Sequence, residues 1–257
     1  MKANYHTHTP RCQHATGTEE EYIQVAIEHH MEILGFSDHT PQFYPDGKIS
    51  AIRMRPEELP EYAQTIEDLK KKYAGQIEIH TGLEVEYYPD LFPELISYVR
   101  DTPVEYLLIG QHWCGNEIGE IYNGRPATED EQRLKRYCYQ VAEAMQTGLF
   151  TYLAHPDLMD FVGPDEIYEK HMRWLCREAN SNQMPLEINL LGMISNRCYP
   201  NEKLWRIAGE ENCRVVLGAD AHTPKGLYVP EYESRALEMV KTYCLQLQQT
   251  VQLRPIR

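Results

Sequence analysis

Short apolar runs alternate with helix-like segments along the whole chain. Seven of these runs have the length and composition of buried strands, and the segments between them carry apolar residues at helical spacing. Strands are expected at residues 2–6, 33–37, 77–84, 105–111, 150–154, 185–189 and 214–218. Because repeated strand–helix units build parallel sheets, the pattern predicts an α/β fold around seven parallel strands.

Helix-start signals support this division of the chain. Thr18 and Glu21 have the spacing of a capping box at the start of a helix. Pro56 suits the first turn of a helix that runs to about Tyr73. Further helices are expected at 90–99, 128–147, 165–180, 200–211 and 231–246. No linker-like stretch or internal repeat interrupts the pattern, so residues 1–257 are predicted to form a single domain.

Histidines and acids fall just beyond six of the seven predicted strands, with one further histidine in a loop. The nine residues are His6, His8, His14, His39, Glu84, His112, His155, Asp220 and His222. Imidazole and carboxylate groups suit divalent transition metals, and nine ligands are too many for one ion. Six strand ends can converge only if the sheet is closed or nearly closed. We therefore predict a distorted seven-unit barrel with two or three metal ions at its carboxyl face.

The spacing within this set indicates how the ligands could be shared. An H-x-H sequence at a strand end points both imidazoles to one side, as in His6 and His8. Asp220 and His222 repeat this geometry on the last predicted strand, which adjoins the first in a barrel. Glu84 is the expected bridging carboxylate, and Glu86 on the same face is the alternative.

The charge and apolar content of the chain limit the kinds of molecule that it is expected to bind. Lys and Arg number 25 and Asp and Glu 39, so the formal net charge is −14, which disfavours binding to long nucleic acids. A small anionic substrate remains compatible, because metal ions supply local positive charge. No apolar run approaches the roughly 18–20 residues of a membrane span, and the start of the chain lacks a signal-peptide pattern.

The seven cysteines are odd in number and form no C-x-x-C pair, which is typical of reduced thiols in a cytoplasmic protein. Three of them, Cys12, Cys114 and Cys198, fall in loops expected near the site, and we interpret them as incidental. Residues 40–55 and 113–127 are long loops that follow ligand-bearing strands. They are candidates for lids or specificity elements, with a solvated surface loop as the alternative.

The chain resembles the PHP (polymerase and histidinol phosphatase) family, and within it the histidinol-phosphate phosphatases. The resemblance extends over nearly the whole chain. It is carried by Tyr5-His6-Thr7-His8 with His14, Gly35-Phe36-Ser37-Asp38-His39, Gly82-Leu83-Glu84-Val85-Glu86, Leu108-Ile109-Gly110-Gln111-His112, Ala154-His155-Pro156-Asp157, Leu186-Glu187-Ile188-Asn189 and Gly218-Ala219-Asp220-Ala221-His222. It implies a distorted (β/α)7 barrel with a trinuclear metal centre.

The resemblance also implies which residues hold which ion. The first ion would be held by His6, His8, Glu84 and Asp220. The second would share Glu84 and take His112 and His155, and the third would take His14, His39 and His222. Zn, Mn or Fe would suit such ligands.

The implied reaction is hydrolysis of L-histidinol phosphate to L-histidinol and phosphate, in histidine biosynthesis. Hydroxide held between two ions that Glu84 bridges would attack phosphorus, with Asp220 and His222 holding the ions. Asp38 could protonate the leaving group, although an orienting role beside a ligand is the favoured interpretation.

Substrate-binding residues are predicted with less support from the motifs. Relatives carry an arginine close to the strand-six Glu-x-Asn motif, whereas here Arg197 lies further along the loop and is expected to reach the phosphate. Arg11 could also meet an anion, with a solvated surface role as the alternative. Glu117 and Asp157 are candidates for binding the substrate's ammonium group.

Two other functions stay open. One is a PHP phosphoesterase acting on nucleotides or other small phosphate esters, and the other is a non-catalytic barrel that only binds metal. Oligomeric state has no signature in the sequence.

Overall fold

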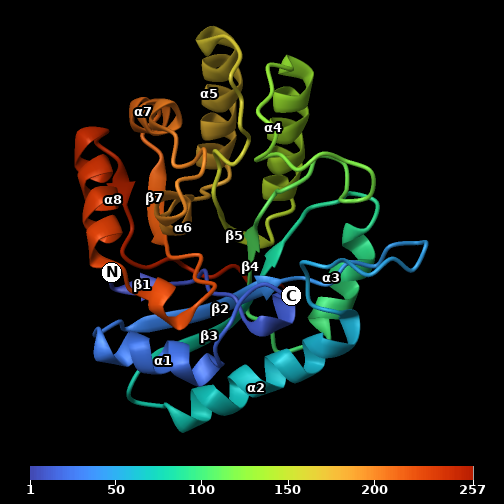
Figure 1. Ribbon diagram of the computed structural model, residues 1–257, viewed down its shortest axis with the longest axis vertical. Helices are drawn as coiled ribbons and strands as arrows, with labels where there is room; N and C mark the ends of the chain where they lie inside the picture. Colours follow the sequence, from blue (N-terminus) through green and yellow to red (C-terminus); the bar gives the residue numbers. More distant parts are fainter. Residues whose placement is uncertain (257) are drawn as a thin grey trace.

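The computed structural model describes residues 1–256, and its strands form one curled, all-parallel sheet (Figure 1). Each strand pairs with the next one along the chain. The strands are β1 (Ala3–Asn4), β2 (Ile33–His39), β3 (Glu78–Val85), β4 (Tyr106–Ile109), β5 (Phe150–Leu153), β6 (Leu186–Asn189), β7 (Arg214–Gly218) and β8 (Gln246–Leu247). The predicted distorted α/β barrel is confirmed, with one addition. The two-residue β8 was not predicted, because it has no apolar run to mark it.

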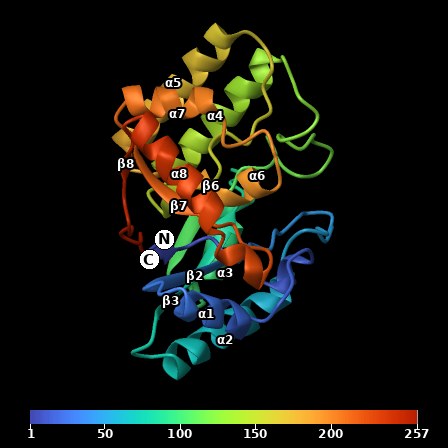
Figure 2. The same ribbon diagram turned by 60° about the vertical axis from the view of Figure 1, so that its left-hand side comes forward.

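Helices cover the outer face of the curled sheet (Figure 1 and Figure 2). They are α1 (Glu19–Glu28), α2 (Leu59–Lys72), α3 (Phe92–Arg100), α4 (Glu131–Gln146), α5 (Asp165–Ser181), α6 (Leu190–Ile194), α7 (Glu202–Glu210) and α8 (Pro230–Thr242). Thr18 caps α1 through both bonds of the predicted capping box. The helix expected from Pro56 begins as a 3₁₀ turn, η2 (Pro56–Glu58), and α6 is too short to show a periodic pattern. No helix within residues 1–256 is long and apolar enough to cross a membrane.

The sheet closes only at its carboxyl end. β1 and β8 form no ladder with each other, but the chain just beyond β1 pairs in parallel with the chain just beyond β7, where Thr7 lies opposite Ala221. The amide of His8 donates to Ala221 O at 2.9 Å, and the amide of Ala221 donates to His6 O at 3.2 Å. The ends of β1 and β7 therefore lie side by side, at the face where the predicted ligands lie.

A small apolar cluster fills the barrel interior beneath that face. Its members are Ala3, Tyr5, Tyr106, Leu108, Tyr152, Ala154 and Val216. The hydroxyl of Tyr106 donates to Tyr5 O at 2.6 Å, so a strand-four side chain binds the first strand across the interior. Val251 and Leu253, from the end of the chain, pack against the same cluster. The interior is thus a packed floor for the site rather than a channel.

We expect Tyr106→Ala to lower the free energy of unfolding by about 3–5 kcal/mol, because it removes a fully buried aromatic ring and opens a cavity. Urea denaturation followed by circular dichroism would measure the change. Tyr139→Ala is the matched control, since Tyr139 is half exposed, and it should cost about 1 kcal/mol or less. Equal costs for the two variants would contradict the assignment of Tyr106 to the barrel core.

Candidate metal centre

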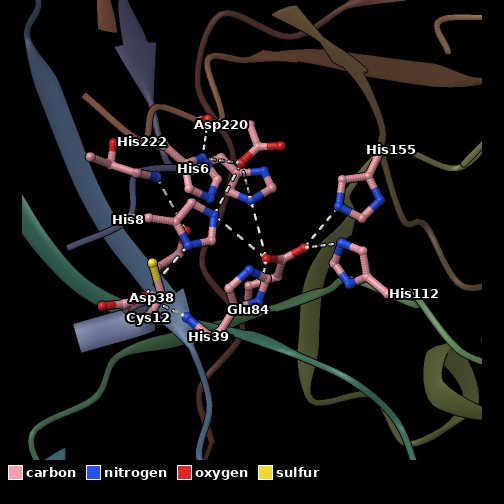
Figure 3. Close-up of polar contacts among 12 residues, drawn as sticks. His6, His8, Cys12, Asp38, His39, Glu84, His112, His155, Asp220 and His222 are labelled. Carbon is pink, nitrogen blue, oxygen red and sulfur yellow. Dashed lines mark hydrogen bonds and ion pairs between the residues drawn. The ribbon is translucent and has the colours of Figure 1, made fainter. Parts of the chain in front are cut away.

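The structure brings all nine predicted ligands together at the carboxyl face of the barrel. Figure 3 shows them with the exception of His14. Most of them lie on strand ends or in the first residues that follow a strand. His14 comes instead from the loop after a short 3₁₀ helix, η1 (Pro10–Cys12). Seven of the nine are buried, while His222 is partly exposed and His14 is exposed.

Glu84 on β3 lies at the centre of this group. One carboxylate oxygen lies 2.8 Å from His155 Nε2, and the other lies 2.9 Å from His39 Nδ1. His6 Nε2 and His8 Nε2 are each 3.6 Å from the second oxygen. One carboxylate is thus surrounded by imidazoles from three other segments of the chain, as expected of a bridging ligand.

Asp220 forms a second anionic position close to the first. Its Oδ1 lies 3.0 Å from His8 Nε2 and 3.5 Å from His6 Nε2, so these two imidazoles face both carboxylates. Burial would raise the pKa of Asp220 and of Glu84, but the neighbouring imidazoles outweigh it and hold both values well below the usual range. The site therefore presents two ionised, buried carboxylates, which require cations close by.

The imidazole nitrogens facing these carboxylates lack other partners. Within residues 1–256, His6 Nε2, His8 Nε2 and His39 Nδ1 are buried and make no hydrogen bond of acceptable geometry. Leaving such atoms unsatisfied costs about 1–3 kcal/mol each. A divalent ion coordinated by nitrogen and oxygen would satisfy them, so the residues present fit metal ions.

The ligand atoms fall into overlapping groups, each with its members within 4.8 Å of one another. These groups are His6–His8–Glu84, His6–His155–Asp220, His39–Glu84–His112, His14–His39–His222 and His8–Cys12–His222. His39, expected with the third ion, belongs both to that group and to the group at Glu84. Cys12 was not predicted to take part.

Behind the ligands lies a layer of groups that orient them. His6 Nδ1 lies 2.7 Å from Glu187 Oε1 on β6, and His112 Nδ1 lies 2.7 Å from Glu86 Oε1. Such outer contacts set the tautomer and the direction of a metal-binding imidazole. Glu187 belongs to the Glu-x-Asn motif of β6. Its position on the same strand face as Asn189 was the available signal for a polar role.

Two glycines leave the space that the carboxylates occupy. A Cβ at Gly110 would lie 1.9 Å from Glu84 Oε1, and one at Gly218 would lie 1.8 Å from Glu187 Oε1. Each glycine lies on the strand next to the acid that it accommodates. Its missing side chain leaves room for that carboxylate, and the ligand follows two residues later, as His112 after Gly110 and Asp220 after Gly218.

Asp38 lies behind His8 rather than in the open pocket. Its carboxylate accepts a hydrogen bond from the Thr9 hydroxyl and one from the His39 amide, and it lies 3.5 Å from His8 Nδ1. The side chain is fully buried and does not line the cavity over the metal centre. These contacts favour the orienting role over direct protonation of a leaving group.

The cavity above the centre has a volume of about 200 Å³ and reaches Ile52, Trp113, Tyr122 and Arg197. Of the predicted substrate-binding residues, only Arg197 lines it. The guanidinium of Arg197 donates to the Tyr199 hydroxyl at 2.6 Å. A second cavity of about 440 Å³ adjoins the first, because Tyr122 and Arg197 line both.

The other three predicted substrate residues lie elsewhere and have other partners. Arg11 pairs with Glu19 and Glu61 and packs over Tyr62. Asp157 is buried and accepts a hydrogen bond from the Asn201 amide. None of the three lines either cavity, and their role in substrate binding stays a prediction.

Glu117 instead joins the two long loops. It accepts hydrogen bonds from Arg53 Nε at 2.8 Å, Ser50 Oγ at 2.7 Å and the Tyr44 hydroxyl at 3.0 Å. The same Arg53 donates to Glu86 at 2.9 Å, the acid that orients His112. Both loops are therefore attached to a metal-centre residue through one buried guanidinium.

The family model described as PHP domain matches residues 4–190. The chain belongs to the PHP family.

Curated relatives of this PHP protein carry phosphatase names. It is 33% identical over 232 residues to the "Probable histidinol-phosphatase" of Deinococcus radiodurans, with 85% of each chain covered. It is 34% identical over 253 residues to the "Histidinol-phosphatase" of Bacillus subtilis, covering 86% of this chain and 94% of the relative. Among solved structures, histidinol phosphate phosphatase from Lactococcus lactis, complexed with Zn, L-histidinol and phosphate, has a TM-score of 0.74 over 98% of both chains at 19% identity. That structure supports the fold.

We expect Glu187→Gln to lower metal affinity about 10–100-fold, because His6 loses the anion that fixes its orientation. Competition for Zn²⁺ against a chelator of known affinity would measure the loss. Glu166→Gln, at an exposed helix position, is the matched control. Unchanged affinity in the Glu187 variant would show that this carboxylate does not support the centre.

We expect metal affinity to fall as the pH falls. Burial would lower the pKa of His6, but the charges of Glu187 and Asp220 raise it well above its usual value in the metal-free protein. A bound ion must displace that proton, so binding releases protons and strengthens as pH rises. Because the pKa of His6 lies above the usual imidazole value of about 6.5, metal affinity measured by equilibrium dialysis should already fall as the pH is lowered from about 8 to about 6.5. Full occupancy maintained to about pH 4.5 would contradict imidazole ligation.

Proposed function

We propose that the protein is a metal-dependent phosphomonoesterase that hydrolyses L-histidinol phosphate to L-histidinol and phosphate. The observation that carries the proposal is a centre of nine imidazoles and carboxylates that opens into a cavity lined by Arg197. Two curated relatives above 30% identity are named as phosphatases of this substrate. The reaction belongs to histidine biosynthesis, and the seven free cysteines agree with a cytoplasmic location.

The proposed ligand sets follow the contacts. His6, His8 and Asp220 would hold one ion with Glu84, and His112 and His155 would hold a second from the other side of Glu84. His14, His39 and His222 would hold a third. When bound, Zn, Mn or Fe ions neutralise phosphate charge and lower the pKa of water so that it can attack phosphorus.

The protein's own residues position the ester. The guanidinium of Arg197 would bind the phosphate oxygens that gain charge in the transition state. The Tyr199 hydroxyl accepts one of its hydrogen bonds and restricts its direction. Trp113 and Tyr122 form the aromatic wall of the cavity, in edge contact with their ring centroids 5.4 Å apart. Such a wall excludes water from the reacting phosphate.

Asp160 replaces Glu117 and Asp157 as the candidate for the substrate's ammonium group. It lines the 440 Å³ cavity that shares Arg197 with the metal cavity. Its backbone is fixed by hydrogen bonds to Asn123 and Thr128. A carboxylate in the cavity that Arg197 also lines suits an ester whose alcohol carries a positive charge.

The test of the function is kcat/KM for L-histidinol phosphate beside nucleotides, a purine 3′,5′-bisphosphate and glycerol phosphate, after reconstitution with Zn, Mn or Fe. We expect a preference for histidinol phosphate of about a hundredfold or more, equal to about 2.7 kcal/mol. Faster turnover of the bisphosphate would replace this function by nucleotide hydrolysis. No turnover of any ester by the metal-loaded protein would favour a non-catalytic barrel.

We expect Asp160→Asn to raise KM for L-histidinol phosphate about 10–100-fold, since a hydrogen bond to a charged group contributes about 1.5–3 kcal/mol. Glycerol phosphate has no cation, so its kcat/KM should stay nearly unchanged. Asp101→Asn, on the exposed surface, is the control for the loss of one charge. Equal losses for both esters would remove Asp160 from substrate selection.

A further inference from the structure

Cys12 is a buried thiol between two predicted metal ligands, His8 and His14. It is the last residue of η1, which Thr9 caps at its start and which ends at Gln13 with φ 69°. The turn directs the Cys12 side chain inward, where its exposed fraction is 0%. Gln13 and His14, the next two residues, are exposed.

Two imidazoles lie beside this thiol. The ligand atoms of Cys12, His8 and His222 lie within 4.8 Å of one another. The rings of His8 and His222 stack with centroids 4.1 Å apart and planes at 22°. Figure 3 shows the Cys12 sulfur beside the His8 ring, below His222.

The imidazole of His8 provides independent evidence for a ligand at this position. Within residues 1–256, both of its ring nitrogens are buried and neither makes a hydrogen bond of acceptable geometry. One nitrogen faces the carboxylates of Glu84 and Asp220, whereas Nδ1 faces Asp38 at 3.5 Å. When Nε2 is directed at an ion, Nδ1 carries the ring proton, and a metal-bound thiolate at Cys12 would give that N–H an acceptor.

We propose that Cys12 is a metal ligand, and that its sulfur binds the ion held by His222. On binding, the thiol proton is released to solvent and the thiolate forms the new bond to the divalent ion. His14, which shares that ion in the proposed set, is exposed, so Cys12 would add a second buried ligand beside His39. The inference rests on the proposed metal centre.

A thiolate changes which ion this position selects. Soft sulfur favours Zn²⁺ and Cd²⁺ over Mn²⁺, whereas the imidazole and carboxylate groups around Glu84 accept any of these. We therefore expect one position of the centre to prefer zinc and the others to exchange more freely. No other cysteine within residues 1–256 shares a group with two potential metal ligands.

Cadmium titration tests the proposal directly. Cd²⁺ bound to thiolate gives an ultraviolet charge-transfer band that imidazole and carboxylate ligands do not give. We expect the wild-type protein to develop this band with the stoichiometry of one thiolate, and Cys12→Ser to lose it while still binding Cd²⁺. Cys198→Ser is the matched control. Its thiol lines the neighbouring cavity and lies 3.5 Å from Leu158 O, and the variant should keep the band.

A second measurement uses only the wild-type protein, so it does not require the Cys12 variant to fold. X-ray absorption of the Zn-loaded wild-type protein should show a sulfur neighbour at about 2.3 Å beside the nitrogen and oxygen shell. A shell of nitrogen and oxygen alone, or a band retained in Cys12→Ser, would overturn the proposal. In both cases the bound metal and the hydrolysis of histidinol phosphate would stand, so failure of this inference is distinct from failure of the proposed function.

Discussion

The buried carboxylate of Glu84 is the group on which the rest of the site depends. An ionised carboxylate removed from water costs several kcal/mol unless opposite charge surrounds it. Here His6, His8, His39 and His155 approach it from three other segments. The imidazoles in turn contact a second ring of acids, with Glu187 behind His6 and Glu86 behind His112. The alternation of acid, imidazole and acid holds the ligand side chains in fixed positions, and divalent ions would complete the charge balance.

The ligands can surround Glu84 only if the strand ends converge. The closure of the sheet at its carboxyl end brings these ends together. Closure occurs only where Thr7 pairs with Ala221, next to His6, His8, Asp220 and His222. At the amino end the first and eighth strands do not pair, and the chain after β8 packs Val251 and Leu253 against the interior cluster. The barrel is therefore open only at its amino end, and the carboxyl end that carries the ligands is closed. A sheet opened at the carboxyl end would separate the two ligand pairs.

The sequence predicted those parts of the molecule in which side-chain direction follows from strand geometry. Parallel strands end at one edge, so the order of strands alone places the His6–His8 pair and the Asp220–His222 pair at the same face. The short α6 and β8 were missed because neither contains a full period of any pattern. Loop residues were harder to place, because nothing in residues 113–127 indicates which way the loop turns. Glu117 turned toward Arg53, and the acid that lines the neighbouring 440 Å³ cavity is Asp160.

The path of that loop also connects the wall of the cavity to the candidate metal ligands. Arg53 is a fully buried cation, and such a group is tolerated only when anions surround it. Its two partners have different functions, since Glu117 belongs to the loop over the site and Glu86 orients His112. The Arg53 guanidinium also lies 5.7 Å from the centre of the Trp113 ring, part of the cavity wall. A displacement of the loop would therefore disturb the charge that holds a metal ligand, so the wall of the substrate cavity and the metal centre are built as one unit.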